Sequence, residues 1–145
     1  MSSQARLLQD VDEVVEAWRL CLRKGDIEQA LSLWFDEDTV TCILPDGVRL
    51  IGHIQLREGL SNLMNRPIIL DTLTSTSHTY LGVTFIDSTE AIRFEEETLD
   101  PSLFLHMTMI LVQGTMGWRI AHLHSSQVPK EAIQPPSLIG DHGFH

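Results

Sequence analysis

The sequence predicts a single α+β domain in which a curved antiparallel sheet wraps around three N-terminal helices. Two observations predict this class. Apolar residues recur at helical spacing as far as Arg66, and the segment 68–126 then changes to stretches rich in Thr, Val, Ile and Phe with turn residues between them. Helices that come first and strands that follow are typical of an α+β architecture, in which the concave side of the sheet holds the core and any pocket.

Three helices are expected before the sheet. In 4–23, apolar residues fall at spacings of three and four and form one stripe of an amphipathic helix. The stripe consists of Leu7, Val11, Val14, Val15, Trp18 and Leu22. A shorter helix is expected over 27–34. A third begins after Gly52 and ends at Arg66, because Pro67 disfavours helical geometry in the residue before it.

The strands are expected in the second half of the chain. A short strand over 39–44 precedes the turn at Pro45-Asp46-Gly47, so a short strand pair is expected there. Four long antiparallel strands should follow, over 68–80, 83–99, 103–113 and 118–126. The segment 114–117 is expected to be a four-residue hairpin loop. We expect one folded domain over 1–129 and a C-terminal tail over 130–145, where no period is sustained.

Composition limits the partners and the location of the chain. Its 145 residues suffice for one domain with a packed core that needs no metal or disulfide. Twenty acidic residues against ten basic ones give a formal net charge of -10, which repels phosphate backbones and anionic lipids. We therefore expect neither nucleic acid nor membrane as a partner. Early acidic residues such as Asp10 and Asp12 exclude the apolar centre of a secretory signal, so a cytoplasmic protein is expected.

The segment 117–126 carries a family resemblance. It reads GWRIAHLHSS, which resembles the last strand of SnoaL-like domains in the nuclear transport factor 2-like superfamily, and it is also similar to the association domain of calcium/calmodulin-dependent protein kinase. The similarity extends to Trp18, Gly25-Asp26, Ala30-Leu31 and the segment 45–52. The resemblance covers about 4–128 and implies a cone-shaped, cystatin-like roll.

The resemblance implies a shape rather than one chemistry. This architecture hosts isomerases, polyketide cyclases, dehydratases, binding proteins and oligomerising hubs. Steroid-isomerase relatives carry a carboxylate as general base just before the proline of the early loop, whereas this sequence has Leu44 at that position. The departure argues against proton-shuttling isomerase chemistry.

Alternation along the last strand places two histidines with apolar residues. One face of this strand carries Trp118, Ile120, His122 and His124. If the loop before it has four residues, Leu111 pairs with Ile120, Met109 with His122 and Met107 with His124. We assign this face to the concave side. A bulge would reverse the assignment for part of the strand.

The strand expected over 83–99 carries a run of charges. Alternation groups Ala91, Arg93, Glu95 and Glu97, and the family pattern, which keeps a small residue at the position of Ala91, implies that this set faces inward and that Glu96 faces outward. An arginine beside carboxylates in a partly dry pocket would bind a polar ligand. The alternative is a solvated, self-paired charge run at the rim of the cone.

The two histidines of the last strand also suggest a metal site. Residues at i and i+2 on a strand, such as His122 and His124, can ligate one zinc ion. A third ligand is missing, because His106 lies on the opposite face in the predicted register. We therefore expect no metal and no cofactor.

Two functions of different classes follow. The first is a pocket for a small organic molecule, with isomerase-, cyclase- or dehydratase-like activity as an extension. Its candidate ligand-binding residues are Trp34, Tyr80, Arg93, Glu95, Met109, His122 and His124. No catalytic residue is assigned, and whether the chain is an enzyme stays open. The alternative is a non-catalytic association module, a homodimer formed through the convex sheet face that carries Phe104, Ile110 and Val112.

Overall fold

A computed structural model describes residues 10–133 with the exception of residue 97. Three α-helices come first, interrupted by a short strand pair: α1 (Val11–Lys24), α2 (Ile27–Ser32) and α3 (Gly52–Leu63). The strands are β1 (Thr41–Ile43), β2 (Arg49–Ile51), β3 (Ile69–Tyr80), β4 (Val83–Arg93), β5 (Leu103–Gly114) and β6 (Gly117–Val128). A single 3₁₀ turn, η2 (Lys130–Ala132), follows β6 in the described part of the chain.

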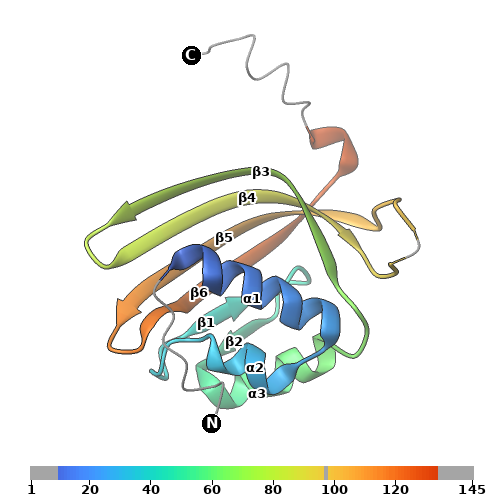
Figure 1. Ribbon diagram of the computed structural model, residues 1–145. Helices are drawn as coiled ribbons and strands as arrows, with labels where there is room; N and C mark the ends of the chain where they lie inside the picture. The colour runs from blue at the N-terminus through green and yellow to red at the C-terminus, as the bar shows by residue number, and fades with distance from the viewer. Residues whose placement is uncertain (1–9, 97, 134–145) are drawn as a thin grey trace, which may run out of the picture.

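The six strands form one curved, open sheet in the order β2-β1-β6-β5-β4-β3. Neighbours are antiparallel except for β1 and β6, which run parallel. Figure 1 shows the sheet bending over the helices, with α1 lying across its concave side. The predicted α+β class, with a curved sheet around three helices, is confirmed.

Helix α1 begins and ends where its capping residues place it. The Asp10 carboxylate accepts a hydrogen bond from the backbone N–H of Asp12 at 2.8 Å, and Gly25 ends the helix at a φ of 72°. Trp18 and Leu22 of the predicted stripe are buried, as are Val14 and Cys21. The predicted first turn, 4–9, lies outside the described residues.

Several predicted bounds change. Strand β4 ends at Arg93 rather than at residue 99. The hairpin loop between β5 and β6 has two residues rather than four, because Gly114 and Gly117 pair with each other. Most of the predicted tail, 130–145, lies outside the described residues.

Strand β6 contains one extra residue. Leu111 pairs with Ile120 as predicted, but the preceding residue of β5, Ile110, pairs with His122, which leaves Ala121 without a partner. This β-bulge reverses the faces of the rest of the strand, so Leu123 is buried on the concave side. The prediction that His122 and His124 face the core was therefore wrong.

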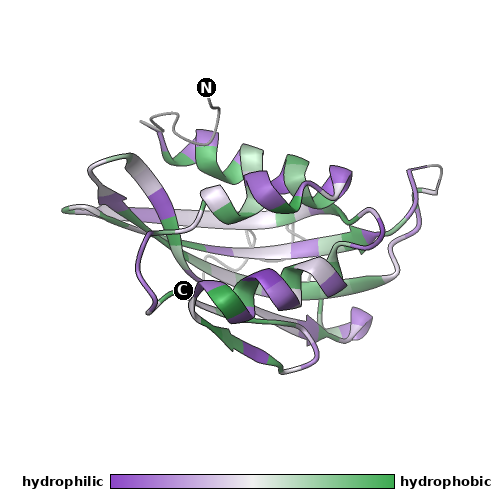
Figure 2. Cartoon of the chain, turned by 90° about the horizontal axis from the view of Figure 1, so that it is seen from below, coloured by the Kyte–Doolittle hydropathy of each residue, from purple (hydrophilic) through white to green (hydrophobic). Residues whose placement is uncertain are grey.

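The core lies between the helices and the concave face. Trp18, Leu56, Leu60, Leu111 and Ile120 are among its fully buried side chains. Figure 2 shows that the helices carry both hydrophobic and hydrophilic residues, as expected for elements that cover one face of a sheet. Within 10–133, residue 97 excepted, no helix is long and apolar enough to cross a membrane.

Helix α3 offers a matched test of this packing. We expect Leu60→Ala to lower the free energy of unfolding by about 2–5 kcal/mol, because the Leu60 side chain is fully buried. Ile54→Ala on the same helix should change it by less than about 0.5 kcal/mol, because Ile54 is 83% exposed. Urea unfolding measures both values. Equal effects would contradict the placement of α3.

Candidate functional site

Two adjoining cavities lie between helix α1 and the concave face of the sheet. The larger has a volume of about 100 Å³ and the smaller about 30 Å³. Both are lined by Trp18, Leu70, Met107 and Leu123, so they meet at these four residues. Together they form the interior site of the domain.

The larger cavity is almost entirely apolar. Its walls come from α1, α3 and the strands, and Leu44, Pro45 and Phe94 lie at its partly exposed end. The guanidinium of Arg66 stacks on the Phe94 ring at 3.8 Å from the centroid, next to this end. Ser125 is the one polar side chain among the described residues of the wall. An apolar group of a ligand would be the natural occupant.

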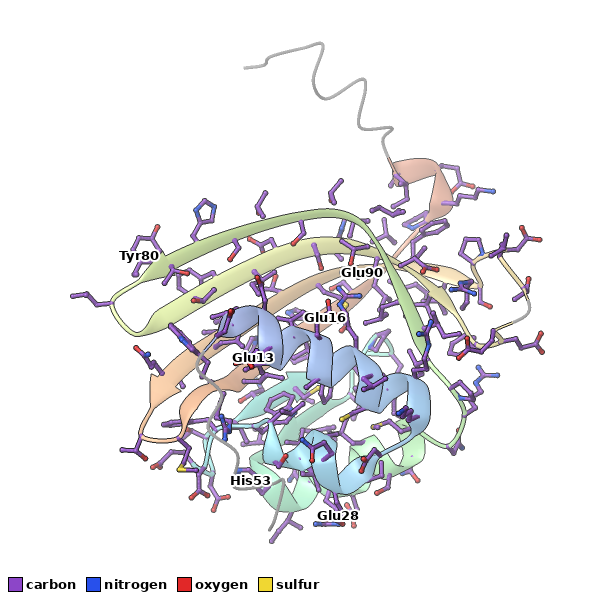
Figure 3. All side chains as sticks on the ribbon, in the orientation of Figure 1. Glu13, Glu16, Glu28, His53, Tyr80 and Glu90 are labelled. Carbon is purple, nitrogen blue, oxygen red and sulfur yellow. The ribbon has the colours of Figure 1, made fainter. Side chains whose placement is uncertain are left out.

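The smaller cavity holds an ion pair at its wall. Arg19 of α1 meets Glu90 of β4 through two contacts, Nη2 to Oε2 at 2.9 Å and Nη1 to Oε1 at 3.3 Å. Thr72 of β3 accepts from Arg19 at 2.7 Å and donates to Glu90 at 2.9 Å. The Glu90 side chain is 1% exposed and that of Arg19 is 25% exposed. Figure 3 shows Glu90 on the sheet above α1.

The ion pair makes this end of the site polar but neutral. The carboxylate of Glu90 already accepts three hydrogen bonds from Arg19 and Thr72. A buried charge needs such compensation, since an isolated carboxylate would be strongly desolvated. The pair therefore fixes α1 on the sheet and leaves little net charge for a ligand.

One residue at the junction carries a polar group without a protein partner. The indole N–H of Trp18, which is 2% exposed, has no hydrogen-bond acceptor within the described residues. Buried donors are rarely left unpaired, so this N–H indicates a place for a polar atom that the protein does not supply. The hydroxyl of Ser125 is a second polar group in the wall of the larger cavity.

The predicted charged residues of β4 lie away from this site. Arg93 faces the convex side, where its Nε donates to Asp71 at 2.7 Å and its Nη1 to the carbonyl of Thr98 at 2.8 Å. The hydrogen bond from Arg93 holds the pKa of Asp71 below its ordinary value. Glu95 follows the end of β4 and is exposed. The inward face assigned to Arg93 was wrong, because Glu90 and Ile92 occupy it.

The predicted histidines also face the convex side. His122 and His124 lie beyond the bulge, with ring centroids 6.4 Å apart. Burial, and secondarily the neighbouring His124, lowers the pKa of His122. Among the residues that the structure describes, no group of three His, Cys, Asp or Glu side chains could hold a metal ion.

The remaining predicted residues are dispersed. Met109 lines the smaller cavity. Tyr80 is 64% exposed at the tip of the β3–β4 hairpin, far from Glu90 in Figure 3. Trp34 is buried behind Trp18, with ring centroids 5.8 Å apart, and borders a separate surface cleft of about 300 Å³. The structure thus brings only Met109 of the predicted set into the interior site.

Sequence reasoning missed Trp18, Arg19, Glu90 and Ser125 as site residues. A signal for Glu90 was present, because alternation places it on one face with Ile86 and Ile92, whose size suits a core. The choice of face rested on Ala91 instead. Nothing local pairs Arg19 with Glu90, because 71 positions separate them in the chain.

The fold is the cystatin-like fold of solved structures, one of which is described as a nuclear transport factor 2-like protein. A family model described as a SnoaL-like domain matches residues 11–131, so the chain belongs to the SnoaL-like family. Members of this fold family are ligand-binding or enzyme-like domains. No curated protein matches the sequence.

Solved structures share this fold at low sequence identity. A candidate dehydratase of the nuclear transport factor 2-like family from Streptomyces avermitilis has a TM-score of 0.73 and 21% identity, over 82% of this chain and 94% of that chain. A candidate calcium/calmodulin-dependent protein kinase type II association domain from Thiobacillus denitrificans has a TM-score of 0.73 and 16% identity, over 85% of this chain and 98% of that chain. An uncharacterised protein with a cystatin-like fold from Caulobacter vibrioides has a TM-score of 0.69 and 16% identity, over 84% of this chain and 89% of that chain.

The ion pair in the site can be tested by a double-mutant cycle. We expect Arg19→Met to destabilise the fold by about 3 kcal/mol, because it leaves the buried Glu90 carboxylate uncompensated. The double variant Arg19→Met/Glu90→Leu should lose less stability than Arg19→Met alone. Urea unfolding at pH 7 gives the values.

The exposed Arg57–Glu28 pair supplies the control. Arg57→Met should leave stability unchanged, because both side chains are more than half exposed and water already solvates them. If Arg19→Met were as harmless as Arg57→Met, the Arg19–Glu90 pair would not hold α1 on the sheet.

Proposed function

We propose that this chain binds a compact, uncharged, mainly apolar molecule that carries one hydrogen-bond acceptor, in the cavity beneath helix α1. The observation that supports this most directly is the buried N–H of Trp18, which has no acceptor among the described residues and belongs to a side chain that lines both cavities. The apolar walls of the larger cavity would hold the body of the ligand. The indole and Ser125 would hold its oxygen.

The size and charge of the site support this ligand class. An apolar cavity of roughly 150 Å³ accommodates benzene, so cavities of about 100 and about 30 Å³ suit a molecule of one ring. A carboxylate ligand would find no free positive charge here, because Arg19 is already paired with Glu90. A ketone, ether or alcohol needs no such counter-charge.

Trp18→Phe separates this proposal from non-specific binding. Cyclohexanone should bind the wild-type chain, and Trp18→Phe should weaken its affinity roughly 3- to 10-fold, the value of one net hydrogen bond. Benzene, which has no carbonyl acceptor, should bind both proteins equally. Titration followed by NMR measures the dissociation constants.

Trp34→Phe is the matched control, because the Trp34 N–H is also buried and unpaired within the described residues but lies outside both cavities. It should leave cyclohexanone binding unchanged. Equal losses in the two variants, or no binding of neutral ring compounds while cyclohexanecarboxylate binds, would contradict the proposed ligand class.

A homodimer formed through the convex face is a second proposed property. Apolar side chains on that face are incompletely covered, including Ile51 at 46% and Phe85 at 39% exposure. Phe104, Ile110 and Val112 lie on the same face and are partly exposed. Contiguous exposed apolar groups mark interaction surfaces. Two of the similar structures are described as kinase association domains.

Light scattering at pH 7.5 tests the dimer. The wild-type chain should have twice the mass of one chain, and Ile110→Asp should have the mass of a single chain, because a carboxylate would be desolvated in the contact. Cyclohexanone binding should survive this substitution. A monomeric wild-type chain would contradict the dimer.

A further inference from the structure

A cleft separate from the interior site lies at the end of the domain where β5 turns into β6. It has a volume of about 300 Å³, which is in the range of small-molecule sites, and α2, α3 and the β5–β6 hairpin contribute to its walls. We call it the hairpin cleft. Among its lining residues are Leu31, Phe35, Asp36, His53, Met116 and Arg119. None of its described lining residues borders either interior cavity, and Figure 3 shows His53 far from Glu90 of the interior site.

Main-chain contacts hold one wall of the hairpin cleft in place. The segment 33–35 runs beside β6, because the N–H of Ile120 donates to the carbonyl of Leu33 and the N–H of Phe35 donates to the carbonyl of Ile120, each at 2.8 Å. The Phe35 ring lies close to the hairpin, since a Cβ atom at Gly114 would be 3.1 Å from its Cε1. This wall is therefore formed before any ligand arrives, which lowers the cost of binding.

Two hydrogen-bond acceptors adjoin one peptide bond of this wall. Nε2 of His53 lies 2.8 Å from the carbonyl oxygen of Phe35, and it donates there because a carbonyl can only accept. The neutral imidazole then keeps Nδ1 as an acceptor, which has no partner among the described residues. The same carbonyl belongs to the peptide bond that precedes Asp36, whose exposed carboxylate forms no ion pair with any described residue. A ligand at this place has to supply hydrogen-bond donors.

Arg119, which also lines the cleft, holds the turn of the hairpin. Its Nη1 donates to the carbonyl of Met116 at 2.9 Å and to that of Trp118 at 2.8 Å. Arg119 is 7% exposed, whereas Asp36 is exposed, so a ligand that enters from solvent meets the carboxylate. The formal net charge of -10 adds a long-range attraction for cations.

We propose that the hairpin cleft binds a small organic ammonium ion. The three N–H donors of the ammonium group are shared between the carboxylate of Asp36 and Nδ1 of His53, and the charge of Asp36 compensates that of the ion. The apolar part of the ion packs against Leu31, Phe35 and Met116, and a cation close to an aromatic ring gains a further attraction. This site shares no described residue with the interior site and does not depend on the ligand proposed for it.

Three probes that share one ring and differ in charge test the ligand class. Benzylammonium should bind in the hairpin cleft roughly tenfold more tightly than benzyl alcohol, and benzoate should bind more weakly than either, because only the ammonium supplies charged donors to Asp36. Methionine methyl signals in NMR titrations at pH 7.5 report where each probe binds. Met116 lines the hairpin cleft, whereas Met107 and Met109 line the interior site, so benzylammonium should move the Met116 signal and leave the other two.

A pair of neighbouring carboxylates separates contact from general attraction. Asp36→Asn should weaken benzylammonium binding roughly tenfold, because it removes the charge that compensates the ammonium. Glu37→Gln is the matched control, since it removes the same charge from the next residue, which is exposed but does not line the cleft. It should change the dissociation constant by less than about twofold, because salt screens an exposed charge that is not in contact. Circular dichroism checks that both variants are folded.

The outcomes keep the two sites apart. Equal effects of Asp36→Asn and Glu37→Gln, tighter binding of benzoate than of benzylammonium at Met116, or a benzylammonium shift confined to Met107 and Met109 would each overturn the hairpin cleft as an ammonium site. Cyclohexanone, followed at Met107 and Met109, tests the interior site separately. The two probes should bind together without competing, and failure of one to bind leaves the proposal for the other site standing.

Discussion

A single extra residue in β6, Ala121, determines what each face of the sheet presents. Before it, Ile120 packs into the core opposite Leu111. After it, Leu123 and Ser125 are buried on the concave side, and the two histidines turn to the convex side. Without the bulge, two imidazoles would enter an apolar interior and the cavity would lose an apolar wall. The chemistry inside the cone and the surface outside it thus depend on the same backbone irregularity.

The Arg19–Glu90 pair resolves a second conflict between burial and charge. Glu90 belongs to the inward face of β4, where Ile86 and Ile92 are its neighbours on that face. Helix α1 supplies the compensating guanidinium, and Thr72 completes the network. The net attraction within such a buried pair adds little to the stability of the fold. Removing one partner is strongly destabilising, because it leaves an unpaired buried charge. The pair therefore locks the position of α1, and with it the position of Trp18 above the cavity.

Local sequence signals predicted the fold better than the site. The apolar stripe of the first helix and the change to β-rich segments depend on near neighbours, so the α+β class could be predicted. The bulge has one mark in the sequence: the apolar residues Ile120 and Leu123 are three positions apart, so they share a strand face only if one residue between them is extra. The strict alternation used for the prediction passed over that shift. The contact between Arg19 and Glu90 depends on packing between distant segments. Those two features decide which polar groups reach the interior.

The proposed interior site and the proposed convex contact do not compete for the same side chains. The partly exposed end of the cavity is at Leu44, Pro45 and Phe94, so a ligand can enter without crossing the convex face. Yet β6 contributes to both, with Leu123 on the cavity and its neighbours His122 and His124 on the other side. Close packing leaves little room for one face of a strand to move without the other. A change in the bulge at Ala121 would accordingly disturb ligand binding and assembly together, whereas changes at Trp18 or Ile110 would disturb only one of them.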